Sequence, residues 1–292
     1  LSSLYPLRGI PVEMATNFIN TPKDGSALEV IAHIDAAALK FALVGDRHQA
    51  TLELIGLVFD EKGKTVENFG DKLAMNFRQA SLENTLKNGV TYGKQLKLKP
   101  GYYQVRFVAR EDGVKQIGSA SSWIEIPDLA KKSLTLSSIF FPAGGEDLVP
   151  ATTAQQQNGN VPSKPKDDSV ARHPAPVYRR FKREGSFDFM VFAYNASRNE
   201  KGATDLAVQT QIYAGDKLLL ATPLKNFADT GKQIGPTGNG PSNADQPDPE
   251  RLPYMARLSL NTFEPGTYEL RMLVIDRNAK TSTKRMVNFT VE

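Results

Sequence analysis

A short motif occurs twice in this chain, at the same place in each half. Shifting residues 99–126 by 165 positions places five residues on identical ones, namely Pro100, Gly101, Tyr103, Arg106 and Lys115 on Pro265, Gly266, Tyr268, Arg271 and Lys280. In the same alignment Glu111 falls on Asp276, and the apolar positions 105, 107 and 108 fall on apolar positions. A repeat at a fixed offset indicates two related structural units.

Apolar and polar residues alternate with period two through most of both halves, which is typical of half-buried β-strands. The pattern predicts strands at residues 27–35, 51–60, 65–69, 101–110, 115–126, 133–141, 186–195, 205–213, 218–222, 255–261, 267–276 and 280–291. Only residues 79–87 are expected to be helical, and we expect about seven strands before Pro127. The expected fold class is all-β, with two tandem immunoglobulin- or fibronectin-III-like antiparallel sandwiches at residues 1–130 and 131–292.

The repeated motif has a structural interpretation. Proline fixes φ and glycine permits the turn into the following strand. Tyr103 and Tyr268 are then expected to point inward, each hydroxyl bonding a nearby backbone group as in the tyrosine corner of such sandwiches.

Two proline-containing insertions interrupt the second half, at residues 142–185 and 227–253. Loops of this length are usually functional or disordered. The second insertion carries oxygen ligands of the kind that calcium prefers, although their spacing fits no calcium-binding loop: Asp229, Asn239, Asn243, Asp245, Asp248 and Glu250. Its glycine-rich residues 235–240 lack the flanking strand and helix of a phosphate site.

Little catalytic chemistry is available. The chain has no cysteine and three histidines, His33, His48 and His173, each of which is more often structural or solvated than a ligand. The motifs of metallohydrolases, serine hydrolases, nucleotide-binding loops and EF-hands are absent. We therefore predict no enzyme, and no catalytic, cofactor-binding or metal-binding residue is assigned.

The net charge of +4 is mild for 292 residues. One basic cluster contains Arg179, Arg180, Lys182 and Arg183, with Tyr178 and Phe181 between them, and we expect a solvated strand entry there and no nucleic-acid partner. No apolar stretch approaches the roughly 20 residues of a membrane span, so no membrane insertion is expected. A sugar site would need exposed aromatic residues in a row, and the candidates, each expected to serve packing, are Tyr92, Tyr102, Trp123, Tyr178 and Tyr254. Among them, Tyr102 should face outward, opposite to Tyr103.

The order of these motifs resembles the region downstream of the A domain in bacterial exported proteins related to the von Willebrand factor A domain (VWFA-related proteins). The resemblance is carried by residues 5–12 (YPLRGIPV), 61–64 (EKGK), 98–106 (LKPGYYQVR), 178–181 (YRRF), 194–195 (YN) and 263–291. It implies export and a position carboxy-terminal to an A domain. It brings no site, because the metal-ion adhesion motif D-x-S-x-S has no match; residues 24–28 (DGSAL) lack the second serine.

The sequence therefore favours a non-enzymatic, extracytoplasmic β-sandwich segment that acts as a spacer or protein-interaction module. The alternative is a module that binds an extracellular polysaccharide or another polymer through the two inserted loops. Because the first residue is Leu1 and not methionine, we expect the chain to come from a longer precursor.

Overall fold

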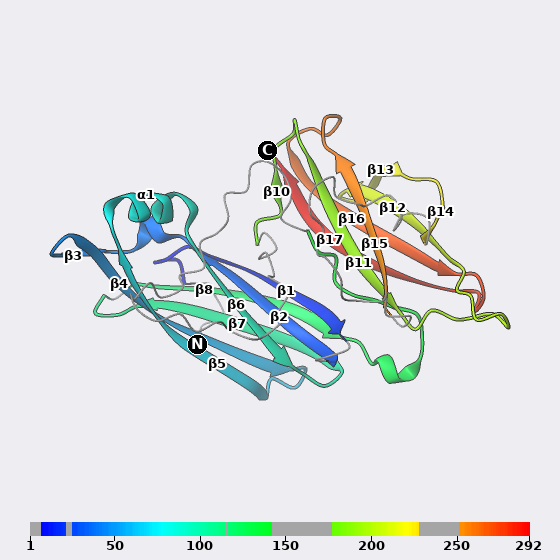
Figure 1. The fold of residues 1–292 in the computed structure, drawn as a ribbon, viewed down its shortest axis with the longest axis horizontal. Coiled ribbons are helices and arrows are strands. Elements are labelled where there is room, and N and C mark those ends of the chain that lie inside the picture. The colour runs from blue at the N-terminus through cyan, green and yellow to red at the C-terminus, as the bar shows by residue number, and fades with distance from the viewer. Residues whose placement is uncertain (1–6, 22–24, 115, 142–176, 228–250) are drawn as a thin grey trace, which may run out of the picture.

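The computed structural model describes residues 7–21, 25–114, 116–141, 177–227 and 251–292. These residues form four sheets, almost wholly antiparallel, around two hydrophobic cores (Figure 1). The prediction of an all-β fold is confirmed at this level. The candidate calcium ligands, the glycine-rich residues 235–240, residue 24 and His173 lie outside the described residues.

The first half contains two facing sheets. One has the order β1-β2-β6, formed by Val12–Thr21, Gly25–Ile34 and Val90–Lys97. The other has the order β3-β4-β7-β8, with β5 also paired to β4; its strands are Ala42–Val44, Arg47–Asp60, Thr65–Phe77, Gly101–Glu111 and Ile117–Ile126. The helix α1, Gln79–Asn88, lies at one end of these strands (Figure 1).

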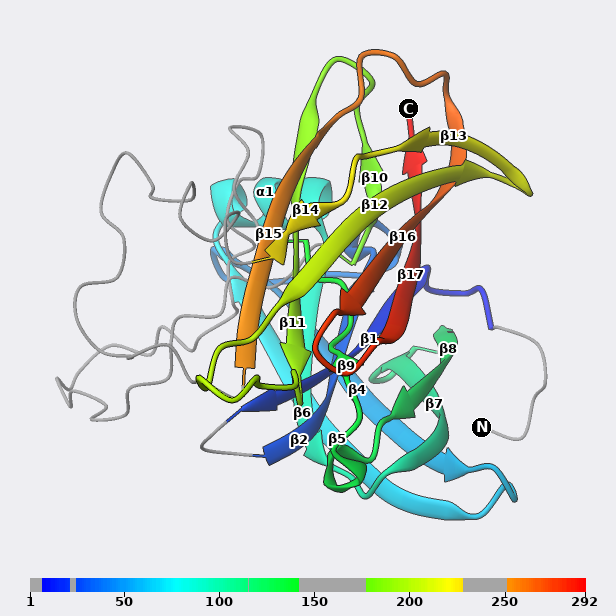
Figure 2. The ribbon, with the colours of Figure 1, turned by 90° about the vertical axis from the view of Figure 1, so that its right-hand side faces the viewer.

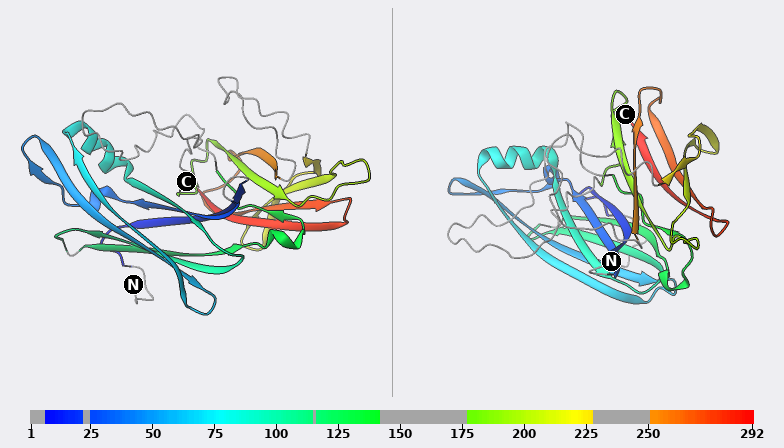
Figure 3. Two further views of the ribbon diagram at one scale, coloured as in Figure 1. Left: turned by 60° about the horizontal axis from the view of Figure 1, so that its bottom comes forward. Right: turned by 45° about the vertical axis from the view of Figure 1, so that its right-hand side comes forward.

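The second half also contains two sheets. One has the order β15-β11-β9, formed by Arg251–Ser259, Ser186–Tyr194 and Thr135–Leu136. The other has the order β10-β17-β16-β12-β13, with β14 paired to β12; its strands are Arg180–Phe181, Thr281–Val291, Gly266–Asp276, Leu206–Ala214, Lys217–Ala221 and Lys225–Asn226. Figure 2 shows this larger sheet beside β11 and β15. The two halves are joined through the 3-10 helix Leu129–Lys131, and Figure 3 shows them side by side.

The prediction of a strand at residues 133–141 is largely wrong, because within this segment only Thr135–Leu136 forms a regular strand. The segment changes partners as it runs. The amide of Ser137 donates to Phe192 of β11 over 2.9 Å, and the amide of Ser138 donates to Phe18 of β1 over 3.0 Å. Residues 137–140 therefore connect the sheet β1-β2-β6 to the sheet β15-β11-β9.

The described residues of the second half extend into both predicted insertions. Strand β10 lies within residues 142–185 and pairs in parallel with β17. Strand β15 begins at Arg251, so the last residues of the predicted insertion at 227–253 belong to a strand. Proline 253 suggested a loop, but β15 is an edge strand, where a missing amide hydrogen is tolerated. The structure also has eight strands before Pro127, where about seven were expected.

Strand β11 contributes to both cores. Phe189 and Val191 pack in the core of the second half, whereas Phe192 and Tyr194 pack in the core of the first half. Because successive side chains of a strand point to opposite faces, β11 is buried on both sides at its end. The two cores are thus separated by a single sheet.

Candidate functional site

The junction between the halves is the part of the described structure where residues from many elements converge. We use "junction" for the contact of residues 12–20 and 33 with residues 137–140, 178–180 and 190–194. Strand β1 lies at the edge of its sheet, and such an edge presents unpaired amide and carbonyl groups. These backbone groups of β1 need hydrogen-bond partners from outside the sheet.

The second half seals the edge of β1. Phe18 donates its amide to the hydroxyl of Ser138 over 2.8 Å and accepts the amide of Ser138 at its carbonyl over 3.0 Å. Two residues further along, the hydroxyl of Tyr194 accepts the amide of Asn20 over 2.9 Å and donates to the carbonyl of Asn20 over 3.2 Å. Alternate residues of an edge strand direct these groups to the same side, so Ser138 and Tyr194 together replace a neighbouring strand.

A second contact fixes the other side of the junction. His33 of β2 lies against Tyr178, with ring centroids 4.3 Å apart, and the Tyr178 hydroxyl hydrogen-bonds the histidine Nδ1. The histidine Nε2 lies 2.8 Å from the carbonyl of Asn88, which can only accept, so Nε2 carries the proton and Nδ1 accepts from tyrosine. Burial lowers the pKa of His33 to about 4, against a smaller opposing effect of Asp35. Burial also raises the pKa of Tyr178 to about 12. Both groups are neutral near pH 7.

A pocket of about 240 Å³ opens beside this junction. We call it the junction pocket. It lies between strands β1 and β8 of the first half and β17 of the second, together with the segments before β10 and around residue 138. Its lining residues are Met14, Ala15, Thr16, Ser122, Trp123, Ile124, Glu125, Ser138, Ile139, Arg179, Arg285, Met286 and Val287.

Two partly buried arginines give the junction pocket its charge. Arg285 donates from Nη2 to the carbonyl of Leu136 over 2.7 Å and from Nε to that of Ser137 over 3.2 Å. The Arg179 carbonyl accepts the amide of Thr290 over 2.7 Å, which holds its backbone beside β17. Burial lowers the pKa of both guanidinium groups. They nevertheless stay charged, as guanidinium does in proteins.

The aromatic candidates separate into two groups. Trp123 and Tyr102 are 65% and 57% exposed on the outer face of adjacent strands β8 and β7. The packing expected of Trp123 and Tyr102 is not observed, but Tyr102 does lie on the face of β7 opposite to the buried Tyr103, as expected. Tyr254 is buried, Tyr92 bonds Asp71 from the middle of β6, and Tyr178 bonds His33, so these three serve packing as predicted.

The basic cluster is distributed over several partners. Arg180 bonds Glu13 over 2.8 Å, and Arg183 forms a two-pronged pair with Glu264 at 2.9 and 3.1 Å. Only Arg179 of the cluster lines the junction pocket. His48 lies in strand β4 opposite Phe77. Within the described ranges, no group of three acidic, histidine or cysteine side chains could hold a metal ion.

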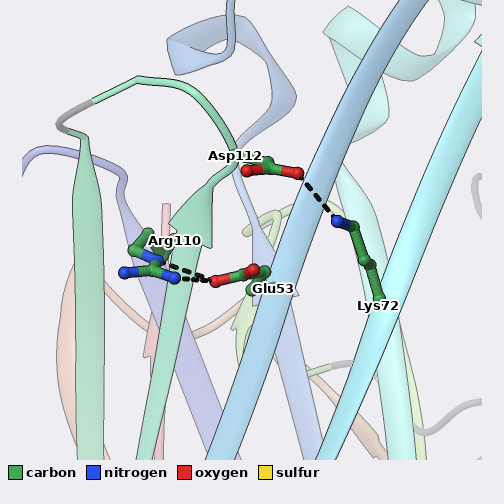
Figure 4. Close-up of polar contacts among 4 residues, drawn as sticks. All are labelled: Glu53, Lys72, Arg110 and Asp112. Carbon is green, nitrogen blue, oxygen red and sulfur yellow. Dashed lines mark hydrogen bonds and ion pairs between the residues drawn. The ribbon is translucent and has the colours of Figure 1, made fainter.

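A set of ion pairs lies on the outer face of the first half, away from the junction. Lys72 of β5 bonds Asp112 over 2.8 Å, and Arg110 of β7 bonds Glu53 of β4. Figure 4 shows both pairs. The hydrogen bond between Lys72 and Asp112 raises the pKa of the lysine and lowers that of the aspartate. Each charge has an opposite partner at the surface, so this set offers no acid–base pair.

Sequence reasoning named Arg179 and Trp123 but did not bring them together, and it missed Arg285, Ser138 and Tyr194. One available signal was the continuous apolar run 191–194, since a strand buried on both faces loses its alternation. The other was the pair of serines at 137–138 inside the apolar segment 133–141. No helix of the described chain is long and apolar enough to cross a membrane.

No family model matches the sequence, and no curated protein matches it. Among solved structures, one that is similar in part is Escherichia coli alpha-2-macroglobulin activated by porcine elastase. The match covers 97% of this chain and 22% of that chain, with 8% sequence identity and a TM-score of 0.26. The chain therefore spans about a fifth of that protein's length. A likeness at this level says nothing about what the chain binds.

Proposed function

We propose that the chain is a non-enzymatic, rigid spacer or protein-interaction module, made of two tandem immunoglobulin-like sandwiches at residues 1–130 and 131–292. The observation that carries the proposal is the sealing of strand β1 by Ser138 and Tyr194. A spacer must hold its ends at a fixed distance, and this contact opposes bending because bending would expose unpaired backbone groups.

Two further features support the tandem arrangement. Tyr103 donates its hydroxyl to the carbonyl of Lys99 over 2.9 Å, and Tyr268 does the same to Glu264 over 2.5 Å, each four residues earlier. Glu111 and Asp276, at matching places in the repeat, are both buried and accept backbone amides. Repeated details of this kind favour two copies of one sandwich.

The setting of the module is proposed from the sequence resemblance. We place it in an exported protein, carboxy-terminal to a von Willebrand factor A domain, with a protein as its partner. Polymer binding by residues 142–185 and 227–253 stays a prediction, because most of these residues lie outside the described structure.

The rigidity is testable by distance measurement between two spin labels. The chain has no cysteine, so a pair such as Lys62→Cys and Asp216→Cys would place one label on an exposed turn of each half without background. We expect a single narrow distance distribution by pulsed electron paramagnetic resonance. The pair Lys62→Cys and Asp46→Cys, within the first half, controls for motion of the label itself. A distribution much broader between the halves than within the first half would contradict the proposal.

A further inference from the structure

We propose that the junction pocket binds a carboxylate-bearing sugar, as one residue of an acidic polysaccharide. This inference goes beyond the spacer function and does not depend on it. It rests on two guanidinium groups that form no close ion pair within the described residues, on exposed aromatic faces beside them, and on the size of the space.

The charge in the pocket is incompletely balanced. Neither Arg179 nor Arg285 forms an ion pair with any carboxylate in the described part of the chain, and within those same residues the Arg179 guanidinium has no hydrogen-bond acceptor. Arg285 donates from Nε and Nη2 to main-chain carbonyls, which leaves the N–H groups of Nη1 for a ligand. Glu125 is the acidic residue of the lining, and it also hydrogen-bonds the Tyr102 hydroxyl.

Two cations against one anion, partly removed from water, attract a carboxylate more strongly than the same charges on an open surface. Guanidinium is suited to this role because its N–H groups match the two oxygens of a carboxylate. Such a ligand would complete the hydrogen bonds that Arg179 lacks in the described chain.

Aromatic surface favours a sugar as the carrier of that carboxylate. Trp123 lines the pocket and is 65% exposed, and Tyr102 lies diagonally from it on the adjacent strand, since Tyr102 pairs with Glu125 and Gln104 pairs with Trp123. A flat exposed ring offers an apolar face on which a sugar ring can pack. The volume of about 240 Å³ lies just below the about 300–1,000 Å³ of pockets for drug-sized ligands, which suits a ligand as small as one sugar residue.

An acidic peptide is the competing ligand, and the structure favours it less. Extended peptides usually bind by adding a strand to a free sheet edge. The edge of β1 is sealed by Ser138 and Tyr194 at Phe18 and Asn20, two and four residues beyond Thr16, the last residue of β1 that lines the pocket. The pocket instead offers hydroxyl groups, of Thr16 and Ser122, which lie 3.0 Å apart and can donate or accept toward sugar hydroxyls.

The test is titration calorimetry of the whole chain with three probes, at low and at physiological salt. The probes are tri-galacturonic acid, neutral maltotriose and a tri-glutamate peptide. The variants are Arg179→Gln and Trp123→Ala, since neither side chain holds the described fold through a hydrogen bond. The matched control is Arg257→Gln, which removes the same charge from an exposed pair with Asp188 in the second half.

We expect saturable binding of the acidic sugar, weakened about tenfold or more by Arg179→Gln and by Trp123→Ala and unchanged by Arg257→Gln. Maltotriose should bind at least about tenfold more weakly than tri-galacturonic acid. Equal binding of tri-glutamate would overturn the assignment to a sugar. An equal loss in the Arg257→Gln control, or no binding by the folded chain, would overturn the site. The spin-label distances do not change in either case, so the two proposals fail separately.

Discussion

The hydroxyl of Tyr194 and the backbone of Asn20 exchange two hydrogen bonds across 174 positions of sequence. The tyrosine ring also meets Phe18 edge-on, with ring centroids 6.0 Å apart. Tyr194 lies on β11 of the second half, and Asn20 lies on β1 of the first. The Tyr194 side chain therefore belongs to the apolar core of the first half and bonds the edge strand β1 of that half, while its backbone lies in the second half.

Replacing Tyr194 with phenylalanine should destabilise the chain by about 1–3 kcal/mol. The ring stays in the core, but the amide and the carbonyl of Asn20 lose their partner at a partly buried position. Urea unfolding gives the change in the free energy of unfolding. Tyr213→Phe is the matched control, since the Tyr213 hydroxyl contacts the side chains of Gln211 and Arg271 and no strand-edge backbone group in the described structure, and we expect a change within about 0.5 kcal/mol. Equal effects of the two variants would argue against the sealed edge.

Stability should fall as the pH drops from about 6.5 toward 4 because of His33. The folded-state pKa of about 4 lies below the ordinary value of 6.5, so the unfolded chain binds the proton first. The contribution is fully present above pH 6.5 and is lost as the pH falls through this window. The gap corresponds to about 3 kcal/mol, and partial exposure of the ring reduces the expectation to about 2 kcal/mol.

The measurement is the difference between wild type and His33→Gln at each pH, because other acidic groups titrate in the same window. We expect the free-energy difference between the two proteins to shrink as the pH falls from 7 to 4. A constant difference would show that the histidine does not titrate with the assigned shift.

Strands could be predicted from sequence because their signal is local. The expected strand at 101–110 is observed as Gly101–Glu111, and the one at 205–213 as Leu206–Ala214. The expected helix at 79–87 is observed as Gln79–Asn88. In each case the alternation or the run of helix formers lies within the element itself, so no information about its neighbours is needed.

The junction could not be predicted in the same way, because its residues are brought together by the angle between the halves. Ser138 meets Phe18 across 120 positions, and Tyr178 meets His33 across 145. Trp123 and Arg179 each lie in a locally ordinary strand or strand entry. The continuous apolar run at 191–194 and the serine pair at 137–138 are the local signals, and the run indicates that a second surface covers β11.

Two glycines with positive φ should respond very differently to alanine. Gly63 has φ +76° in a turn with open space around the added Cβ, and Gly63→Ala should cost about 1 kcal/mol of backbone strain. Gly89 has φ +68°, and its Cβ would lie 2.2 Å from Cε1 of His33 and 2.7 Å from the carbonyl oxygen of Ile34. Gly89→Ala should therefore cost about 3 kcal/mol or more. Thermal unfolding of the two variants checks the order, and a smaller loss for Gly89→Ala would contradict the packing of His33.

The buried carboxylates at matching places of the repeat should not tolerate amides equally. Asp276 uses both oxygens, accepting the amide of Ser197 over 2.7 Å and that of Ala279 over 3.0 Å. Glu111 accepts the amide of Lys40 over 2.7 Å with one oxygen, and its other oxygen has no partner in the described structure. An amide side chain has one oxygen and one NH₂ group. In Asp276→Asn the NH₂ group would therefore face one of the two backbone amides that Asp276 accepts. In Glu111→Gln the NH₂ group can take the place of the oxygen that has no partner.

We expect Asp276→Asn to lower the free energy of unfolding by about 2 kcal/mol and Glu111→Gln by less than about 1 kcal/mol. Urea unfolding of both variants at pH 7 measures the two losses under one set of conditions. The conservative variant Asp276→Glu is a poor substitute, since the longer side chain must fit a fully buried site. Equal losses in the free energy of unfolding for Glu111→Gln and Asp276→Asn would contradict this prediction. They would show that both oxygens of Glu111 accept hydrogen bonds, as both oxygens of Asp276 do.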